Sequence, residues 1–438
     1  MALLPVLEGL HSAESFHKAF LGAFFERARE IETHPASFEN ALQGRIIATV
    51  FEEASTRTRL SFEAAAHRLG AQVISVADSK STSHAKGESL LDAARMVGSY
   101  ADLIVWRHPR DGATRVISQA TNIPVVNAGD GRLGHPTQTL VDLYTLHREW
   151  GSLEGKTVGV MGDLRNGRTA RSLLWGLTLA GARVVLLPAP GLDWEVGFET
   201  RVLERSGLRC REVAHPLFKE WTGSERARLL EPKGLLQGSL FRDQVPRVDR
   251  LDALYLTRLQ VERGAEASKG AYPGIRMRQM KDPLLEECLV LHPLPRLAEV
   301  PVELDEDPRA RYFEQARMGP LVRQALFLGM LRPDSWPLPD LAPMPSGNPE
   351  HRLGPCPNKG CITLQEGIRV PWRVCGRKNR HFLCAYCDSK LMAEYVGCHS
   401  SKRVHPIHSQ EVMKIRPENL CPFISRDDAL QDGYQWGG

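Results

Sequence analysis

Short apolar runs alternate with longer amphipathic segments between about Arg45 and Arg332. A run of four to six apolar residues followed by apolar positions at helical spacing is typical of a parallel sheet with helices on both faces. The pattern therefore predicts an α/β fold over this part of the chain. The strands are expected at Ile46–Phe51, Gln72–Val76, Asp102–Trp106, Pro124–Asn127, Thr157–Met161, Val184–Leu187, Ala253–Leu256 and Leu289–Leu291.

Three segments depart from this alternation. The long helical pattern over His135–Trp150 is expected to bridge two such sheets. The segment Trp194–Pro246 is longer and more polar than a simple connection requires, so we interpret it as a helix with an elaborated surface insertion. Seven prolines without apolar periodicity between Pro333 and Pro355 predict a semi-rigid linker. A chain of 438 residues divided in this way suggests two or three domains.

Composition and charge exclude several classes of protein. The chain is 42% hydrophobic and 25% charged, as in ordinary globular proteins. Its 56 basic and 52 acidic residues are interspersed, and no basic tract with interleaved aromatic residues predicts a nucleic-acid partner. No run approaches the ~18 apolar residues of a membrane helix, and no basic region precedes an apolar segment at the N-terminus, so we expect no membrane partner and a cytoplasmic location.

The stretch Phe51–Arg59, which reads F-E-E-A-S-T-R-T-R, follows the first predicted strand and opens a helical pattern that Gly70 ends. Ser55 and Thr56 are candidates for the helix N-cap. Backbone N–H groups at a helix N-terminus favour an anion, and the planar guanidinium of Arg57 can bind two of its oxygens. The stretch therefore suits a phosphate site, although taken alone it fits an ordinary capped surface helix about equally well.

Further polar motifs follow other predicted strands. Ligands bind beyond the carboxyl ends of strands in open parallel sheets, so motifs in these positions favour one shared site. They bring further arginines and a proline-stiffened turn, which suit small anionic substrates. The motifs are Arg107-His108-Pro109, Gly129-Asp130-Gly131, His135-Pro136-Thr137-Gln138, Gly162-Asp163-Leu164-Arg165-Asn166-Gly167-Arg168-Thr169, Thr257-Arg258-Leu259-Gln260 and His292-Pro293-Leu294-Pro295-Arg296.

These motifs occur in the order found in the transcarbamoylases, and from about Leu10 to Leu331 the chain resembles the catalytic chain of aspartate carbamoyltransferases. The resemblance implies two parallel-sheet α/β domains of the transcarbamoylase type. It also implies the reaction of carbamoyl phosphate with L-aspartate to give N-carbamoyl-L-aspartate and phosphate in de novo pyrimidine biosynthesis. The implied domains are residues 1–145 for carbamoyl phosphate, 146–300 for aspartate, and 301–333 as a helix that packs back on the first domain.

The resemblance assigns roles to residues on the carbamoyl-phosphate side. The positions that match its phosphate and carbonyl contacts are Ser55, Thr56, Arg57, Thr58 and Arg107. The positions that match groups at the carbamoyl end are His135 and Gln138.

On the acceptor side, Arg168 and Arg258 match the residues that clamp the two aspartate carboxylates, with Gln260 beside them. Pro293 and Leu294 match a turn whose backbone accepts substrate hydrogen bonds. Ornithine-specific relatives carry a Cys in this turn and an acidic, methionine-containing loop in place of the cationic arginine. The resemblance therefore implies an anionic acceptor.

In the resembled family a Ser and a Lys are contributed by the neighbouring subunit, which implies a homotrimer with shared active sites. The corresponding loop here is Ser81–Glu88. Lys86 matches the lysine, whereas Thr82 and Ser83 compete for the hydroxyl because the loop is one residue short. Glu88 is a further candidate that would brace the arginines of the same site, against the alternative of an exposed carboxylate.

The expected mechanism is sequential and non-covalent. The neutral amine of aspartate attacks the carbonyl carbon, and Arg57, Arg107, Lys86 and His135 stabilise the charge on the carbonyl and leaving oxygens. Holding two anions in reacting geometry contributes up to roughly 7 to 11 kcal/mol, so no side-chain nucleophile, catalytic metal or organic cofactor is expected. The alternatives are a transcarbamoylase for another amino-acid acceptor and a non-catalytic assembly subunit.

Seven of the nine cysteines lie after position 350 and mark a separate module. Two pairs with zinc-site spacing are Cys356-x4-Cys361 and Cys384-x2-Cys387. Four thiolates on tight turns predict one structural zinc ion, and disulfides are less expected in a cytosolic chain. The segment from Pro355 to about Leu391 resembles the zinc domain of aspartate carbamoyltransferase regulatory chains. We expect a linker over 334–355, a small zinc-ribbon-like β domain with a tail over 356–438, and a possible higher assembly through this domain.

Overall fold

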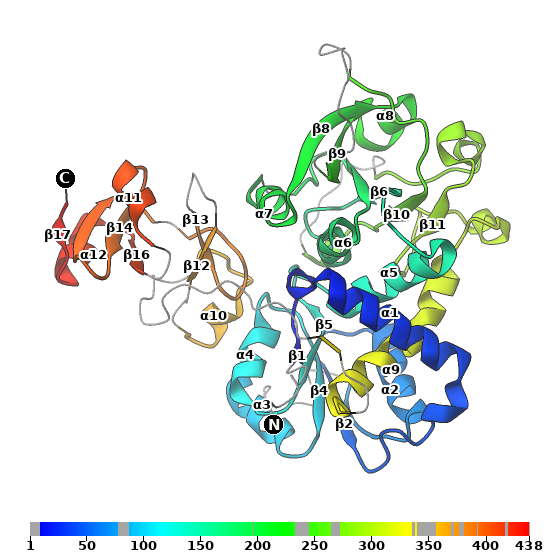
Figure 1. Ribbon diagram of the computed structural model, residues 1–438, viewed down its shortest axis with the longest axis horizontal. Coiled ribbons are helices and arrows are strands. Elements are labelled where there is room, and N and C mark those ends of the chain that lie inside the picture. Colours follow the sequence, from blue (N-terminus) through cyan, green and yellow to red (C-terminus); the bar gives the residue numbers. More distant parts are fainter. Residues whose placement is uncertain are drawn as a thin grey trace.

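The computed structural model describes residues 9–77, 87–194, 196–232, 245–263, 272–334, 338–339, 356–368, 372–375, 381–391, 393–416 and 419–437. Two α/β domains lie next to each other, and a smaller β module lies at one side of them (Figure 1). Within these ranges, no helix combines the length and apolarity needed to cross a membrane. The linker expected at 334–355 lies almost entirely outside the described residues. The loop 78–86 lies wholly outside them.

The first domain contains a five-stranded parallel sheet in the order β1-β5-β4-β2-β3. Alternate residues along its central strands belong to two different cores, as the pleat of a strand requires. Ile47 and Val105 pack on the side of α1 and α2, whereas Ala48 and Ile104 pack on the side of α3 and α4. The elements are β1 Gly9–Leu10, α1 Lys18–Thr33, β2 Ile46–Phe51, α2 Thr56–Arg68, β3 Gln72–Val76, α3 Leu90–Gly98, β4 Leu103–His108, α4 Ala113–Ala120 and β5 Val125–Asp130.

The second domain contains a six-stranded sheet in the order β11-β10-β6-β7-β9-β8. The four strands β11, β10, β6 and β7 are parallel, and β9 runs antiparallel to both of its neighbours. The elements are β6 Thr157–Gly162, α6 Arg168–Leu179, β7 Arg183–Pro188, α7 Val196–Ser206, β8 Leu208–Ala214, α8 Pro216–Thr222, β9 Arg226–Pro232, β10 Ala253–Leu256 and β11 Leu289–Leu291.

The interpretation of Trp194–Pro246 as a helix with a surface insertion was wrong in part. Helix α7 is present, but β8 and β9 extend the sheet by two antiparallel strands, with α8 between them. Charged residues interrupt the apolar pattern of both strands. These residues form ion pairs from one strand to the other. Glu231 of β9 is buried and lies 2.7 Å from Arg209 and 2.8 Å from Arg211 of β8.

Two helices join the domains. Helix α5, Pro136–Trp150, leads from the first sheet to the second, and α9, Tyr312–Leu331, returns to pack against α1, α2 and α5 (Figure 1). Arg148 of α5 pairs with Glu32 of α1 at 3.0 Å and with Glu314 of α9 at 2.8 Å. The carboxyl ends of the strands in both sheets therefore face a gap whose floor is formed by α5 and α9.

The C-terminal module has two parts. Strands β12 and β13 form an antiparallel hairpin, and the remaining strands form a sheet in the order β16-β14-β15-β17. The tail expected at the end of the 356–438 domain is therefore a small folded unit with its own sheet. The elements are α10 Ile362–Gln365, β12 Trp372–Cys375, β13 His381–Cys384, β14 Tyr395–Cys398, β15 Arg403–Pro406, α11 Gln410–Lys414, β16 Leu420–Phe423, α12 Arg426–Gln431 and β17 Gln435–Trp436.

The module docks on the loop between β4 and α4 of the first domain. The backbone N–H of Asp111 donates to Gly360 O at 3.0 Å, and the N–H of Ile362 donates to Asp111 O at 3.0 Å. Asp388 of the module lies 3.2 Å from Arg115 on α4 and 3.4 Å from Arg201 on α7. One carboxylate of the module thus contacts both α/β domains.

Candidate active site and metal centre

The N-terminus of α2 lies at the carboxyl end of β2 and opens into the gap between the domains. Ser55 is the N-cap residue, but its side chain makes no capping bond; its hydroxyl donates to Thr58 Oγ1 at 2.9 Å instead. The N–H groups of the first helical turn have no partner within a helix. Together with the hydroxyls of Ser55 and Thr56, they form a suitable cradle for a phosphate group.

Arg107 and Arg168 come from different domains and meet at one carboxylate. Arg107 Nη2 lies 2.8 Å from Glu53 Oε1 and Arg107 Nη1 donates to Ala128 O at 3.2 Å, while Arg168 Nη2 bonds to the same Glu53 oxygen. Gly129 makes this approach possible: its φ is +125°, and a Cβ there would lie 2.8 Å from Arg107 Nη1 and 2.9 Å from Arg168 Nη1. One negative charge thus holds two guanidinium groups at the junction of the domains.

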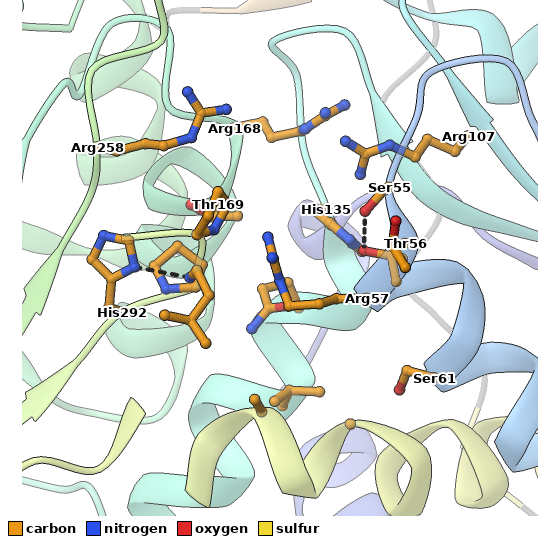
Figure 2. Close-up of a pocket in the computed structure, with 18 of the residues that line it drawn as sticks. Ser55, Thr56, Arg57, Ser61, Arg107, His135, Arg168, Thr169, Arg258 and His292 are labelled. Atoms are coloured by element: carbon orange, nitrogen blue, oxygen red, sulfur yellow. Dashed lines mark hydrogen bonds between the residues drawn. The ribbon is translucent and has the colours of Figure 1, made fainter. Parts of the chain in front are cut away.

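Arg57 extends from the first turn of α2 into the centre of the gap (Figure 2). Among the described residues it has no ion-pair partner, in contrast to Arg107 and Arg168. Desolvation lowers the pKa of Arg57, and the positive charge of Arg258 lowers it further. The guanidinium nevertheless stays protonated at neutral pH, so its charge is available to an anion.

Helix α5 contributes His135 and Gln138 to the same gap. The backbone N–H of His135 donates to Ser172 Oγ at 2.7 Å, which fixes the start of α5 against α6. The side-chain amide of Gln138 donates to Asp142 Oδ1 at 2.8 Å. His135 lies beside Ser55 and Arg57 in Figure 2.

The acceptor side carries Arg258 and Gln260 after β10. Arg258 forms an ion pair with Glu262, four residues later, and its guanidinium donates hydrogen bonds to that carboxylate. These hydrogen bonds raise the pKa of Arg258. The backbone N–H of Gln260 donates to Asp163 Oδ2 at 3.2 Å, which ties the segment to the loop after β6. A substrate carboxylate at Arg258 would have to share or replace the contact with Glu262.

The turn after β11 is held by His292. Its Nδ1 accepts from the N–H of Leu294 at 2.8 Å, and its Nε2 lies 3.0 Å from Glu299 Oε1. Because Nδ1 accepts, Nε2 carries the proton on the side of Glu299. Burial lowers the pKa of His292, so the imidazole is neutral at pH 7. Leu294 has a φ of +54°, a conformation that costs about 1 kcal/mol or more for a residue with a Cβ, and this brace maintains it.

These groups line one pocket of about 500 Å³ between the two domains (Figure 2). All predicted substrate and catalytic residues in the described part of the chain lie in its wall, whereas Lys86, Ser83 and the competing Thr82 fall outside the described residues. Sequence reasoning missed Glu53, Thr169 and Glu262, which also line the pocket. Within the chain, the carboxylate that pairs with Arg107 and Arg168 is Glu53. Glu88 was expected to act on a neighbouring subunit, so its role stays a prediction. The predicted residues are Ser55, Thr56, Arg57, Thr58, Arg107, His135, Gln138, Arg168, Arg258, Gln260, Pro293 and Leu294.

A second centre is formed by four buried cysteines of the module. Their sulfur atoms all lie within 4.8 Å of one another, with 3.4 Å between Cys356 and Cys387 and 3.9 Å between Cys361 and Cys384. A tetrahedral zinc–thiolate site with bonds of about 2.3 Å has sulfur separations of about 3.8 Å. The donor set and its burial therefore fit a structural metal ion. Cys398 and Cys421 lie on β14 and β16, outside this group.

Three family models match the chain. Residues 9–148 match the aspartate/ornithine carbamoyltransferase carbamoyl-P binding domain, and residues 154–330 match the Asp/Orn binding domain of the same enzymes. Residues 354–396 match the metal binding domain of the aspartate carbamoyltransferase regulatory chain.

Individual relatives agree with these models. The aspartate carbamoyltransferase catalytic subunit of Thermoplasma acidophilum is 42% identical over 295 residues, which are 66% of this chain and 86% of that protein. The solved catalytic subunit of M. Jannaschii aspartate transcarbamoylase is 34% identical with a TM-score of 0.59, covering 75% of this chain and 99% of that one. The Trypanosoma cruzi enzyme solved with carbamoyl phosphate and aspartate is 30% identical with a TM-score of 0.59, covering 75% of this chain and 100% of that one.

Proposed function

The chain belongs to the aspartate/ornithine carbamoyltransferase family, and we propose that it is an aspartate carbamoyltransferase with a metal-binding module of the regulatory-chain type in the same polypeptide. It transfers the carbamoyl group of carbamoyl phosphate to the amine of L-aspartate, giving N-carbamoyl-L-aspartate, a precursor of pyrimidines, and phosphate. The observation that carries this proposal is the pocket, in which a phosphate cradle and four arginines face one another across the domain boundary.

The two sides of the pocket suit the two substrates. On the first domain, the start of α2 with Arg57 and Arg107 offers backbone N–H groups, hydroxyls and guanidinium groups to the phosphate. On the second domain, Arg168 and Arg258 offer two cations to a dicarboxylic acid. Gln260 lines the same side, and its backbone N–H donates to Asp163 in the loop after β6. A cationic ornithine side chain would face these arginines at a considerable electrostatic cost.

The reaction forms a C–N bond and breaks a C–O bond. The neutral amine of aspartate attacks the carbonyl carbon, and phosphate leaves with the bonding electron pair and takes the amine proton. Negative charge develops on the carbonyl oxygen and then on the leaving oxygen, near Arg57, Arg107 and His135. Fixed positive groups in a desolvated pocket stabilise this charge without reorganisation during the reaction.

Both carboxylate-binding arginines have protein partners in this structure, Glu53 and Glu262. On the carbamoyl-phosphate side Arg107 shares Glu53, but Arg57 has no ion-pair partner among the described residues, so one cation of that side is open to carbamoyl phosphate. This difference supports binding of carbamoyl phosphate before aspartate, in a sequential mechanism. Product-inhibition kinetics test the order: phosphate should compete with carbamoyl phosphate, whereas N-carbamoyl-L-aspartate should not. Competition of N-carbamoyl-L-aspartate with carbamoyl phosphate, as in a random order, would contradict it.

A bisubstrate ligand tests the pocket as a whole. The Trypanosoma cruzi relative has been solved with N-(phosphonacetyl)-L-aspartic acid, which carries a phosphonate and two carboxylates in one molecule. We expect this chain to bind that compound with a stoichiometry of one, and Arg57→Ala and Arg258→Ala each to weaken binding by about tenfold or more. Equal affinity of both variants and the unchanged chain in calorimetry would contradict the proposed pocket.

The proposal includes a homotrimer whose neighbouring subunit supplies Lys86 and a hydroxyl from Thr82 or Ser83. Large apolar side chains are exposed on α2, on edge strand β3 immediately before that loop, and at the end of α3: Leu60 is 52%, Ile74 41%, Met96 47% and Tyr100 59% exposed. A second copy of this chain is the proposed cover of this surface. Mixed trimers of Arg57→Ala and Lys86→Ala chains should recover activity, up to about a quarter of the sites at equal mixing, whereas no recovery would contradict shared sites.

For the module we propose one structural zinc ion bound by Cys356, Cys361, Cys384 and Cys387. When bound, the ion cross-links the turns that carry the four thiolates. The thiols must be reduced to bind it, which supports a cytoplasmic location. Metal analysis should find one zinc ion per chain, and a Cys384→Ser variant should lose it; an unchanged zinc content would contradict this ligand set.

A further inference from the structure

A chain of hydrogen bonds joins the two sides of the pocket through the helices that form its floor. It runs from Gln138 on α5 to Asp142, one turn later on the same helix, then to Gln315 on α9, and ends at the backbone of His292. Asp142 is 0% and Gln315 is 1% exposed. The chain therefore links the carbamoyl-phosphate side to the turn after β11, and its middle members Asp142 and Gln315 are closed to solvent.

The donor and the acceptor of every bond in this chain can be assigned from the backbone N–H of His292 at its end. The backbone N–H of His292 can only donate, so its partner 3.0 Å away is the carbonyl oxygen of Gln315. The amide nitrogen of Gln315 then points the other way and donates to Asp142 Oδ1 at 2.6 Å. That oxygen acts as an acceptor, and it also accepts from Gln138 Nε2 at 2.8 Å.

This direction fixes the orientation of the Gln138 amide. Its nitrogen is used by Asp142, so its carbonyl oxygen is the atom left for the pocket that Gln138 lines. A carbonyl oxygen can accept from the NH₂ of a carbamoyl group but gains nothing from a methyl group in the same place. A flipped amide would present its own NH₂ to the substrate NH₂, donor against donor.

We propose that Asp142 is a positioning residue that locks the Gln138 amide with its oxygen toward the pocket, and so lets the site select a carbamoyl group over an acetyl group. This inference rests on the proposed function, because it takes the carbamoyl end of the substrate to lie at Gln138. Asp142 itself does not line the pocket and acts only through its neighbours.

The other polar groups around Asp142 do not disturb its hydrogen bond with Gln138. Tyr255 of β10 lies with its hydroxyl against the carboxylate, and Arg323 of α9 faces it as the nearby cation. Arg323 is committed elsewhere as well, since its Nη1 donates to Ser61 Oγ at 2.7 Å. The guanidinium of Arg323 has no acceptor, and the hydroxyl of Tyr255 is directed to Asp142 and Thr169 rather than to Gln138.

Two stable phosphonates test the inference. Phosphonoacetamide carries the carbamoyl NH₂, and 2-oxopropylphosphonate carries a methyl group in its place. By calorimetry we expect the unchanged chain to bind the amide about five- to tenfold more tightly, the worth of one hydrogen bond. Asp142→Ala should reduce this ratio to near one. Asp142→Asn, whose Oδ1 can still accept from both amides, should keep most of it.

The affinity for 2-oxopropylphosphonate reports an intact fold and phosphate cradle in each variant, and Asp142→Val replaces Asp142→Ala if the alanine cavity prevents folding. An unchanged ratio in Asp142→Ala would overturn the inference, as would an Asp142→Asn chain that loses as much as Asp142→Ala. Because the readout is binding, it is separate from the proposed function. Absence of turnover with carbamoyl phosphate and aspartate would count against the function, whereas the ratio decides the role of Asp142.

Discussion

At the scale of single residues, the main feature of the pocket is its concentration of positive charge. Four arginines converge, and two of them are held by one glutamate, Glu53, which comes two residues after β2. The sequence motifs predicted the arginines because each follows a strand and matches the resembled family. They did not predict Glu53 as the partner of Arg168, since that contact depends on how the two domains approach each other, and no local pattern encodes it. The Arg258–Glu262 pair is local, four residues apart, but the motif reading assigned Arg258 only to the substrate.

Arg57 and Arg59 form a matched pair for testing the role of charge. Both lie in the first turn of α2, but Arg57 lines the pocket whereas Arg59 pairs with Glu63 at 3.3 Å outside it. Arg57→Ala should lower kcat by roughly 10² to 10³, the usual cost of removing a group that stabilises developing charge. Steady-state kinetics should show Arg59→Ala within about threefold of the unchanged chain. Similar losses in both variants would mean that the substitutions act by disturbing helix α2, and not through the charge of Arg57.

Asp142 also makes stability depend on pH. Burial raises its pKa from 3.8 to about 7, while hydrogen bonds from Gln138 and Gln315 oppose the rise. Between these values the folded chain keeps a proton that the unfolded chain has lost, so the contribution of this group to stability falls as pH rises and is gone above pH 7. Asp142→Asn has no such proton, so its Tm relative to the unchanged chain should rise from pH 5 to pH 8. A constant difference in thermal unfolding would contradict the shifted pKa.

At the scale of elements, apolar pattern predicted the parallel strands well, because most of them are covered on both faces; β3 is an exposed edge strand and was recognised from its own apolar run. β2, β3, β10 and β11 have the predicted bounds, and the other predicted strands differ by one to three residues at their ends. β1 is only two residues long and carries no pattern of its own. β8 and β9 were missed because arginines and glutamates alternate with their apolar residues, which is typical of an edge that avoids further pairing.

Glu231 on β9 tests whether its ion pairs hold that edge. It is 1% exposed and serves Arg209 and Arg211, while Glu212 on β8 pairs with Arg226 in a contact more than half exposed. Glu231→Gln should lower the free energy of unfolding by roughly 1 to 3 kcal/mol, the worth of charged hydrogen bonds at a buried group. Glu212→Gln should change it by no more than about 0.5 kcal/mol. Equal effects in denaturant unfolding would refute a structural role for the buried pair.

At the scale of the whole molecule, the module and the catalytic body share one hydrophobic core. Cys361, Trp372 and Phe382 of the module pack in the same cluster as Ile104 and Trp106 of the first sheet. The cysteine spacing predicted the metal centre because all its ligands are local in sequence. The docking surface was not predictable, since it depends on a loop between β4 and α4 that looks unremarkable in sequence.

Gly112 in that loop provides a test of docking. Its φ is +88°, and a Cβ there would lie 2.6 Å from Tyr386 Cβ and 2.8 Å from the Tyr386 backbone; Gly151 has a φ of +71° with no atom within 4 Å. Both alanine variants carry left-handed strain of about 1 to 2 kcal/mol, but only Gly112→Ala also pushes the module away. Amide exchange in residues 356–391 should therefore accelerate in Gly112→Ala and not in Gly151→Ala. Equal protection in the two variants would contradict this docking surface.

The central claim is that this pocket transfers a carbamoyl group to aspartate. The most direct measurement is product formation from carbamoyl phosphate by the zinc-loaded full chain, with L-aspartate and L-ornithine offered separately. The account predicts N-carbamoyl-L-aspartate with L-aspartate and no detectable product with L-ornithine, because Arg168 and Arg258 select two carboxylates. Turnover with ornithine, or no turnover with aspartate by a fully assembled sample, would contradict it.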